Sequence, residues 1–201
     1  QRVVDGLHQL LTTLAELPQI RSRDPKAANQ LLAGLQRQNE RVVSLFAVGT
    51  DGQIFSAHSP INQASVKDRK YFQEAMKNLR YSAGDFVIGH FSGKRLLHFA
   101  LPVIDGKTFV NSILVGAIDI THPNSLVGNL ALPKGTRVTL MDRTGTELGG
   151  ADPGPDKVGF PTSPARFQAL ARISAEGTHR EHLTDGTYLV AVRALVLPSE
   201  K

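Results

Sequence analysis

Residues 65–72 hold the side chains of this sequence that are best suited to bind a small molecule. Arg69, Tyr71 and Phe72 fall within one turn of a predicted helix, with Arg69 and Phe72 on the same face. A guanidinium is a rigid fork of donors for a carboxylate, and aromatic rings cover the apolar part of a ligand. The stretch therefore predicts a site for a small anionic or zwitterionic ligand. The alternative is that Arg69 pairs with a neighbouring acid and both rings pack in the core.

His98 is the second candidate, because it is the only polar side chain in the apolar segment 96–100. A histidine in such a strand either borders a ligand site or is satisfied within the core. His179 and His182 are three residues apart in a predicted strand, so they point to opposite faces and cannot bind one metal ion. The sequence shows no nucleophile with a clear base and no phosphate-binding glycine loop. We therefore expect no catalytic residue, no metal ion and no cofactor.

The composition indicates a globular protein. The chain has 201 residues, of which 41% are hydrophobic, and this is enough to bury a core. Its longest apolar runs are far shorter than the ~20 residues of a membrane-spanning helix. The net charge of +5 comes from scattered basic residues, so we expect no nucleic-acid partner. The chain lacks cysteine, so we expect neither disulfides nor thiolate catalysis. It begins at Gln1 without a leader pattern, so we expect flanking segments beyond it.

Two helical segments precede the first predicted strand. Apolar residues recur at spacings of three and four over residues 3–17, which predicts an amphipathic helix that ends before Pro18. Asp24 and Pro25 start a second helix that runs to about Asn39. The leucine stripe of the first helix either packs on its own domain or meets the same stripe of a second copy. We favour the second arrangement, a homodimer through the N-terminal helix.

A hairpin, a helix and three further strands are predicted for the middle of the chain. The segments 42–48 and 53–58 flank a polar turn at 50–52, which is the pattern of a β-hairpin. The helix that follows begins with Ser65 or Asp68 as its N-cap. The last three strands are predicted at residues 85–91, 95–104 and 108–120, with an irregularity near Asn111.

The second half of the chain echoes the first. Residues 138–148 repeat the strand–turn–strand pattern of residues 45–55, and a helix and two more strands follow. This predicts an α+β fold of two stacked modules, each with a central antiparallel sheet, along a long N-terminal helix. We assign residues 1–41 to the helical segment, 42–122 to the first module and 123–201 to the second.

Several motifs resemble the double Cache sensor domain, a family also described as tandem PAS-like modules of the PhoQ–DcuS–CitA type. They are the Asp-Arg-x-Tyr-Phe block at 68–72, the segments 84–89 and 101–103, and the closing strand 115–120. The resemblance covers essentially the whole chain. It implies two PAS-like modules, the membrane-distal one first, in the periplasmic or extracellular part of an inner-membrane protein, between flanking transmembrane helices.

The resemblance implies a sensor domain and no enzyme within these residues. The full-length protein is then a histidine kinase or diguanylate cyclase, or else a chemoreceptor, that binds a small carboxylate or amine. The alternative is a structural ectodomain that dimerises or binds a partner without any small-molecule ligand.

Site residues follow from the same resemblance. In the amino-acid-binding branch of the family, an Arg-x-Trp-Tyr block and an aspartate late in the last distal strand hold the ligand's carboxylate and amine. Arg69 and Asp119 match these positions. The two could instead form a structural ion pair.

The chain also departs from that branch. Tyr71 stands where the branch has Trp, Phe72 stands where it has Tyr, and the region 58–59 replaces an upstream Tyr. We expect a site between the first sheet and the Arg69 helix, which leaves other small carboxylates or amines open as ligands. Its predicted residues are Arg69, Tyr71, Phe72, His98 and Asp119.

Overall fold

The protein has an α+β fold, as the sequence predicted. The computed structural model describes residues 2–60, 65–88, 94–106, 109–120, 136, 138–142, 144–151, 168, 178–183 and 186–192. Its helices are α1 (Arg2–Ala15), α2 (Pro18–Arg21), α3 (Pro25–Gln38) and α4 (Lys70–Asn78). Its strands are β1 (Val42–Gly49), β2 (Ile54–Ala57), β3 (Ser82–Ile88), β4 (Arg95–Asp105), β5 (Phe109–Asp119), β6 (Val138–Met141), β7 (Glu147–Ala151), β8 (Thr178–Leu183) and β9 (Gly186–Ala191).

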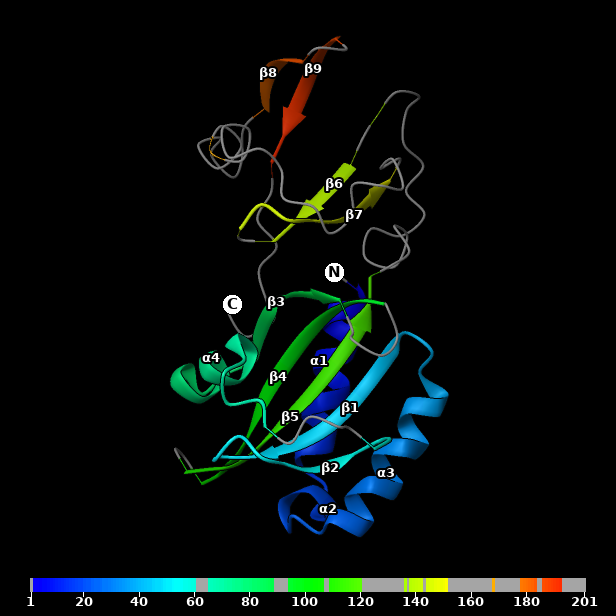
Figure 1. Ribbon diagram of the computed structural model, residues 1–201, viewed down its shortest axis with the longest axis vertical. Coiled ribbons are helices and arrows are strands. Elements are labelled where there is room, and N and C mark those ends of the chain that lie inside the picture. Colours follow the sequence, from blue (N-terminus) through cyan, green and yellow to red (C-terminus); the bar gives the residue numbers. More distant parts are fainter. Residues whose placement is uncertain are drawn as a thin grey trace.

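The first five strands form one antiparallel sheet in the order β2-β1-β5-β4-β3 (Figure 1). The predicted hairpin of residues 42–58 is confirmed, since β1 and β2 pair directly. The predicted irregularity in β5 is also confirmed, because Val103 lies opposite Ser112 while Ile104 lies opposite Val110. Asn111 is therefore the extra residue of a β-bulge.

The side chain of Asn111, at this bulge, connects the sheet to α2 by a hydrogen bond. Its side-chain amide donates to the Arg21 carbonyl at 3.1 Å and to Asp105 Oδ2 at 2.9 Å. Arg21 Nη1 in turn donates to Asp105 Oδ1 at 2.5 Å. A regular strand would not turn the Asn111 side chain toward both partners, so the bulge has a structural use.

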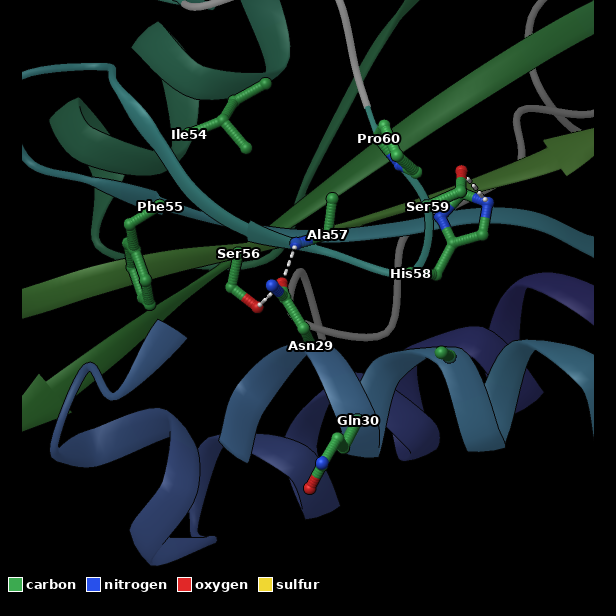
Figure 2. A pocket seen from close by; sticks show the side chains of 10 residues that line it. Asn29, Gln30, Ile54, Phe55, Ser56, Ala57, His58, Ser59 and Pro60 are labelled. Carbon is green, nitrogen blue, oxygen red and sulfur yellow. Dashed lines mark hydrogen bonds between the residues drawn. The ribbon is translucent and has the colours of Figure 1, made fainter. Parts of the chain in front are cut away.

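Helix α3 runs along the edge strand β2. Asp24 caps the helix by accepting hydrogen bonds from the N–H groups of Lys26 and Ala27, and Pro25 occupies the first turn. Farther along, Asn29 Oδ1 accepts from the Ser56 hydroxyl at 2.9 Å and from the Ala57 N–H at 2.8 Å (Figure 2). The helix thus satisfies backbone that an edge strand would otherwise leave open.

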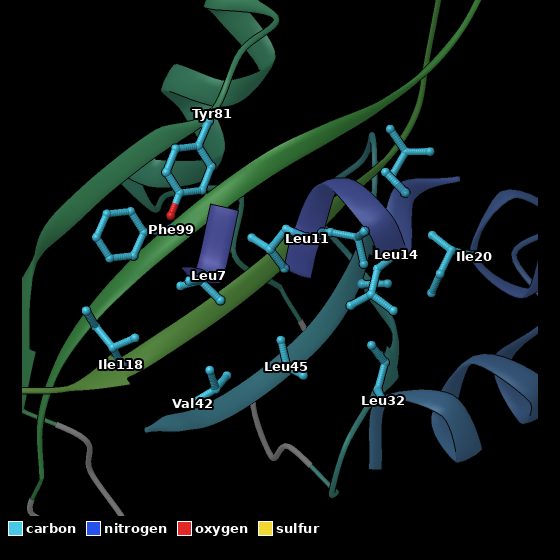
Figure 3. Packing of buried hydrophobic residues seen from close by; sticks show 14 of the residues in the cluster. Leu7, Leu11, Leu14, Ile20, Leu32, Val42, Leu45, Tyr81, Phe99 and Ile118 are labelled. Atoms are coloured by element: carbon cyan, nitrogen blue, oxygen red, sulfur yellow. The ribbon is translucent and has the colours of Figure 1, made fainter. Parts of the chain in front are cut away.

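The leucine stripe of α1 packs on one face of this sheet. Leu7, Leu11 and Leu14 are buried within the chain's own core, together with Leu45 and Ile118 (Figure 3). In Figure 1, α1 lies behind the strands, and its contacts are to β4 and β5. The prediction that this stripe meets a second copy is wrong for these leucines, because the sheet face offers a nearer apolar partner.

Helix α4 covers the opposite face. Phe72 and Ala75 of α4 pack with Phe46, Ala100 and Val115 in a second buried cluster. The predicted N-cap at Ser65 or Asp68 is wrong. The N–H of Arg69 donates to the Val66 carbonyl at 2.9 Å, which forms a turn and delays the helix.

Arg69 itself is the N-cap of α4. Its backbone is extended, and no side chain caps the helix. Ser65 Oγ accepts instead from the Lys67 N–H, inside the preceding turn. Arg69 therefore lies just before the first turn of the helix, and its side chain is 38% exposed.

Two hairpins are described in the second half of the chain. Strands β6 and β7 pair, as do β8 and β9, each as a two-stranded antiparallel sheet. The β6–β7 hairpin confirms the strand–turn–strand pattern predicted for residues 138–148. The predicted helix at 164–175, apart from Gln168, and the boundary between residues 122 and 123 lie outside the described residues. The division into modules stays a prediction.

Candidate ligand-binding site

The first turn of α4 is held over strand β3 by two contacts. Lys70 Nζ lies 2.7 Å from Asp85 Oδ1, and the Tyr71 ring lies directly over Gly84. A Cβ atom at Gly84 would come within 2.8 Å of Tyr71 Cδ1, closer than real Cβ contacts allow. Glycine is therefore required for Tyr71 to approach the sheet this closely.

Tyr71 in turn covers His98 of β4. The two rings stack with centroids 5.2 Å apart and planes inclined by 15°. His98 Nδ1 is buried, and within the described structure it has no hydrogen-bond partner. Leaving such an atom unpaired costs about 1–3 kcal/mol, so a feature of this kind calls for an explanation.

Burial lowers the pKa of His98 from 6.5 to about 4, and the positive charge of Arg69 adds to this effect. The imidazole is therefore neutral at pH 7. A neutral imidazole has one nitrogen that donates and one that accepts, so it can recognise a polar ligand without adding charge to the site.

Arg69 is close enough to influence both rings electrostatically. Burial raises the pKa of Tyr71, and the Arg69 guanidinium opposes this shift. The Arg69 side chain is 38% exposed, and its Nε lies 3.9 Å from Asp68 Oδ2. That is a long and solvent-screened contact, so the guanidinium fork keeps donors for an anion.

Asp119 lies on the same face of the sheet as His98 but does not pair with Arg69. Its Oδ2 is 3.2 Å from Lys94 Nζ, and its side chain is only 16% exposed. Strand register explains the shared face, because Asp119 is opposite Leu96 and Ala117 is opposite His98. The alternative of a structural Arg69–Asp119 ion pair is therefore not realised.

Two other predicted positions have packing or local roles. Phe72 is 4% exposed and belongs to the cluster beneath α4. His58 Nδ1 lies 3.2 Å from the backbone N and O atoms of Leu45, and its Nε2 lies 3.0 Å from Ser59 Oγ. The region 58–59 thus contacts the backbone of β1 just beyond the end of β2. The arrangement brings Arg69, Tyr71 and His98 together, with Asp119 farther along the same face.

Sequence reasoning missed Ser44. It lies opposite Ala117 in β1, and Ala117 lies opposite His98 in β4, so all three point to the α4 side of the sheet. Ser44 is half-buried, and none of the described residues hydrogen-bonds to its hydroxyl. The signal was available, since Ser44 is the one polar side chain in the apolar run 42–48.

A separate groove of about 490 Å³ lies between α3 and β2. It is lined by Asn29 and by residues 54–60, and Figure 2 shows Asn29 reaching from α3 to Ser56 and Ala57. Its central polar groups are thus already paired with one another. None of the charged residues predicted for the site lines this groove.

The described residues contain no group of three or more potential metal ligands. None of their helices combines the length and the apolar character that crossing a membrane requires.

Comparison with known proteins identifies the fold. No protein-family model and no curated protein sequence matches the chain. Solved structures do match. The sensor domain of the V. cholerae histidine kinase DctB aligns over 98% of this chain and 83% of its own, with a TM-score of 0.61 and 13% identity. The chain shares the fold of this sensor domain.

Chemoreceptor domains share this fold. The ligand-binding domain of the Pseudomonas aeruginosa PAO1 amino acid chemoreceptor PctB, in complex with L-Arg, aligns over 92% of this chain and 78% of its own, with a TM-score of 0.66 and 17% identity. The ligand-binding domain of the Pseudomonas fluorescens chemoreceptor CtaA, in complex with L-serine, aligns over 92% of this chain and 79% of its own, with a TM-score of 0.68 and 15% identity. At these identities the likeness concerns the fold alone. The matched structures are sensor and ligand-binding domains, not catalytic domains.

Proposed function

We propose that this chain is the extracytoplasmic sensor domain of a membrane signalling protein, and that it binds a small carboxylate or amine metabolite on the α4 face of the first sheet. The observation that carries the proposal is the cluster at the start of α4. Arg69 there acts electrostatically on His98, whose buried Nδ1 has no partner in the described structure. A buried polar atom without a hydrogen-bond partner lowers the stability of the folded protein, and a ligand that forms this hydrogen bond offsets the loss.

The Cache-type fold supports this proposal. Two of the matched structures are complexes with amino acids, L-Arg and L-serine. Arg69 fits the carboxylate of such a ligand, because a guanidinium can donate two parallel hydrogen bonds to it. Asp119 is the second charged group of the face.

The output of the whole protein is part of the same proposal. A sensor of this fold is expected between transmembrane helices of an inner-membrane protein, in front of a histidine kinase, a diguanylate cyclase or a chemoreceptor signalling domain. Within these residues we expect ligand binding without turnover. A homodimer through the N-terminal helix would use the outer side of α1, where Gln9, Thr12 and Thr13 are exposed.

Ligand binding can be tested by thermal stability. A ligand that binds only the folded state stabilises it by about 2.7 kcal/mol at a hundredfold excess over Kd. We expect at least one member of a panel of small carboxylates and amines to raise the melting temperature and to remain chemically unchanged. A panel that leaves the melting temperature unmoved would favour a purely structural ectodomain.

The role of Arg69 needs a variant. We expect Arg69→Ala to weaken binding of the active compound at least tenfold in calorimetric titration, equal to about 1.4 kcal/mol. Arg37→Ala, which removes an exposed arginine of α3, is the matched control and should bind like wild type. Unchanged affinity together with a lower melting temperature for Arg69→Ala would mean that this residue only stabilises the fold.

A further inference from the structure

The groove between α3 and the edge strand β2 lies apart from the α4 face. Helix α4 contacts β3, β4 and β5, whereas this groove borders the opposite edge of the sheet (Figure 1). Its volume is about 490 Å³, and none of its lining residues is an acid, a lysine or an arginine. Asn29 and Pro60 of the lining are exposed, so the groove is open to solvent along the backbone of β2.

The centre of the groove offers hydrogen-bonding groups that fit an extended peptide. Asn29 Oδ1 accepts from the Ser56 hydroxyl and the Ala57 N–H, but the amide nitrogen of Asn29 has no partner among the described residues (Figure 2). The Ala57 N–H points away from β1, and in an antiparallel strand the carbonyl of the same residue points the same way. The Asn29 amide and the Ala57 carbonyl thus provide a donor and an acceptor for a peptide backbone.

Cations stand beyond both ends of this uncharged centre. Lys26 and Arg37 fall on the same face of α3 as Ala33, which lines the groove, because they lie about two turns before it and one turn after it. Both are exposed, and neither pairs with a carboxylate of the described residues. The groove therefore complements a segment that is uncharged in its middle and acidic at both ends.

Helix α3 runs in the same direction as β2, so each cation marks one end of the strand. The guanidinium of Arg23, just before α3, lies 5.1 Å from the centroid of the Phe55 ring in the first half of β2. Near the other end of the helix, Gln36 Nε2 donates to the carbonyl of Val42 at 3.2 Å. Val42 begins β1, and because β1 and β2 are antiparallel, this is the end of the sheet toward which β2 runs.

The distance between the two cations matches a short extended segment. A rise of about 1.5 Å per residue puts the Cα atoms of Lys26 and Arg37 about 16 Å apart. About five residues of extended chain cover this distance. A peptide of that length brings one acid to each cation while its backbone lies beside Asn29 and Ala57.

We propose that this groove docks an extended acidic segment of a partner protein by strand addition beside β2, with one carboxylate on Lys26, another on Arg37, and its backbone hydrogen-bonded to Asn29 and Ala57. The apolar side chains of the groove, among them Ile54, contact the middle of the segment. This inference goes beyond the proposed function and does not depend on it, because the groove shares no residue with the α4 face.

The test compares two peptides that differ only in their end charges. The first is acetyl-Glu-Val-Thr-Val-Thr-Glu-amide, and the second has lysine in place of both glutamates. In calorimetric titration of the wild-type domain, the glutamate peptide should bind at least tenfold more tightly, and its advantage should shrink at high salt because the cations are exposed. Equal affinities for the two peptides, or no binding of the glutamate peptide, would overturn the proposal.

Charge reversal assigns the contacts. When Lys26→Glu and Arg37→Glu are combined, the glutamate peptide should bind at least tenfold more weakly and the lysine peptide more tightly than to wild type. The matched control combines Lys77→Glu and Arg180→Glu, which change the net charge equally at exposed positions of α4 and β8. The control should keep the wild-type preference, and a reversed preference there would show attraction by net charge alone and overturn the proposal.

A methylated peptide tests the strand addition. The glutamate peptide with N-methyl groups on its four central residues keeps both acids but has no central N–H to donate to the Ala57 carbonyl. It should bind at least tenfold more weakly than the unmethylated peptide. Equal affinity would overturn the proposed backbone pairing, because the acids alone would then hold the peptide.

The charge-reversed variant also separates other occupants of the groove. If it loses the binding of a small carboxylate or amine that wild type binds, the groove belongs to a small molecule and the proposal fails. If wild type sediments as a dimer and this variant as a monomer, the groove belongs to a second copy of the chain and the proposal fails as well. Unchanged small-molecule binding and an unchanged sedimentation coefficient are the expected results.

Discussion

The two faces of the five-stranded sheet are built differently. The face under α1 is mainly apolar, with Leu7, Leu11 and Leu14 packed against strand residues such as Leu45. The face under α4 is apolar only in part. Beyond the cluster around Phe72 it continues into polar residues, with His98 under the Tyr71 ring and Asp119 beside Lys94.

The same structural device appears on both faces with different consequences. Gly116 lies under Leu7 of α1, and Gly84 lies under Tyr71 of α4. Each glycine lets a helix side chain approach the sheet where a Cβ atom would collide with it. On the α1 side this close approach only completes the core. On the α4 side it sets the ring that stacks on His98, so a packing contact also determines the geometry of the candidate site.

The largest expected effect comes from opening the α1 face. Leu11 is fully buried, so Leu11→Ala leaves a cavity and should lower the free energy of unfolding by about 2–5 kcal/mol in urea titration. Thr12→Ala, on the exposed side of the same helix, should stay within about 0.5 kcal/mol of wild type. A loss below 1 kcal/mol for Leu11→Ala would contradict the view that this face holds the fold together.

The pH dependence of stability tests the α4 face. The pKa of His98 is about 4 in the folded protein and 6.5 as its ordinary value, so unfolding takes up a proton between these values. The contribution is fully present above pH 6.5 and is lost as the pH falls toward 4. Between pH 7.5 and pH 4.5, wild type should therefore lose up to about 2–3 kcal/mol more than His98→Phe.

Urea unfolding at the two pH values measures this difference directly. His8 of α1 also has a pKa lowered by burial, but it is present in both proteins and so cancels in the comparison. Identical losses in wild type and His98→Phe would show that His98 titrates as in water and that its burial under Tyr71 is wrong.

The two glycines give the most direct contrast between the faces. In Gly116→Ala the new Cβ would lie 2.6 Å from Leu7 Cδ1, and in Gly84→Ala it would lie 2.8 Å from Tyr71 Cδ1. Both should cost about 1–3 kcal/mol of stability through overpacking. Only Gly84→Ala should also weaken ligand binding, because only there does the displaced side chain cover the site.

Gly34→Ala is the control for the glycine pair. Nothing lies within 4 Å of a Cβ at that position in α3, so this change should stabilise the protein by about 0.5–1 kcal/mol. Equal ligand affinities in Gly84→Ala and Gly116→Ala would separate Tyr71 from the binding function.

The smallest expected effect concerns the anchor at the start of α4. Lys70 and Asp85 lie 2.7 Å apart but are both partly exposed, at 34% and 50%. Lys70→Met should therefore cost less than about 1 kcal/mol, and the loss should shrink further at high salt. A loss of several kcal/mol would mean that this ion pair, rather than the apolar cluster around Phe72, holds α4 on the sheet.

Much of the first sheet could be predicted from local pattern. The turn at residues 50–52 set the β1–β2 hairpin, and the irregularity near Asn111 was placed correctly in a strand too long to stay regular. Asp24 and Pro25 start α3 as expected. In each case the decisive interactions lie within a few residues of one another, so the sequence alone contains them.

The candidate site was predictable only in part. Arg69, Tyr71 and His98 were chosen by residue type and do lie together, but the turn before α4 moved the N-cap to Arg69 itself. The Arg69–Asp119 pair was a reasonable alternative and is not formed, because Lys94 lies closer to Asp119. Which of several nearby cations an aspartate meets depends on strand register and side-chain reach, and neither is visible in residue spacing.

What the sequence by itself determined is the set of elements: a leucine-striped helix, a capped second helix, and strands with their turns. These follow from periodicity and turn chemistry, which act between near neighbours along the chain. Tertiary structure alone decided that the leucine stripe is covered by the chain's own sheet, and that Ser44, Ala117 and His98 form one row. Ser44 and Ala117 are far apart in sequence and meet only through the pairing of β1 with β5, which long-range register determines.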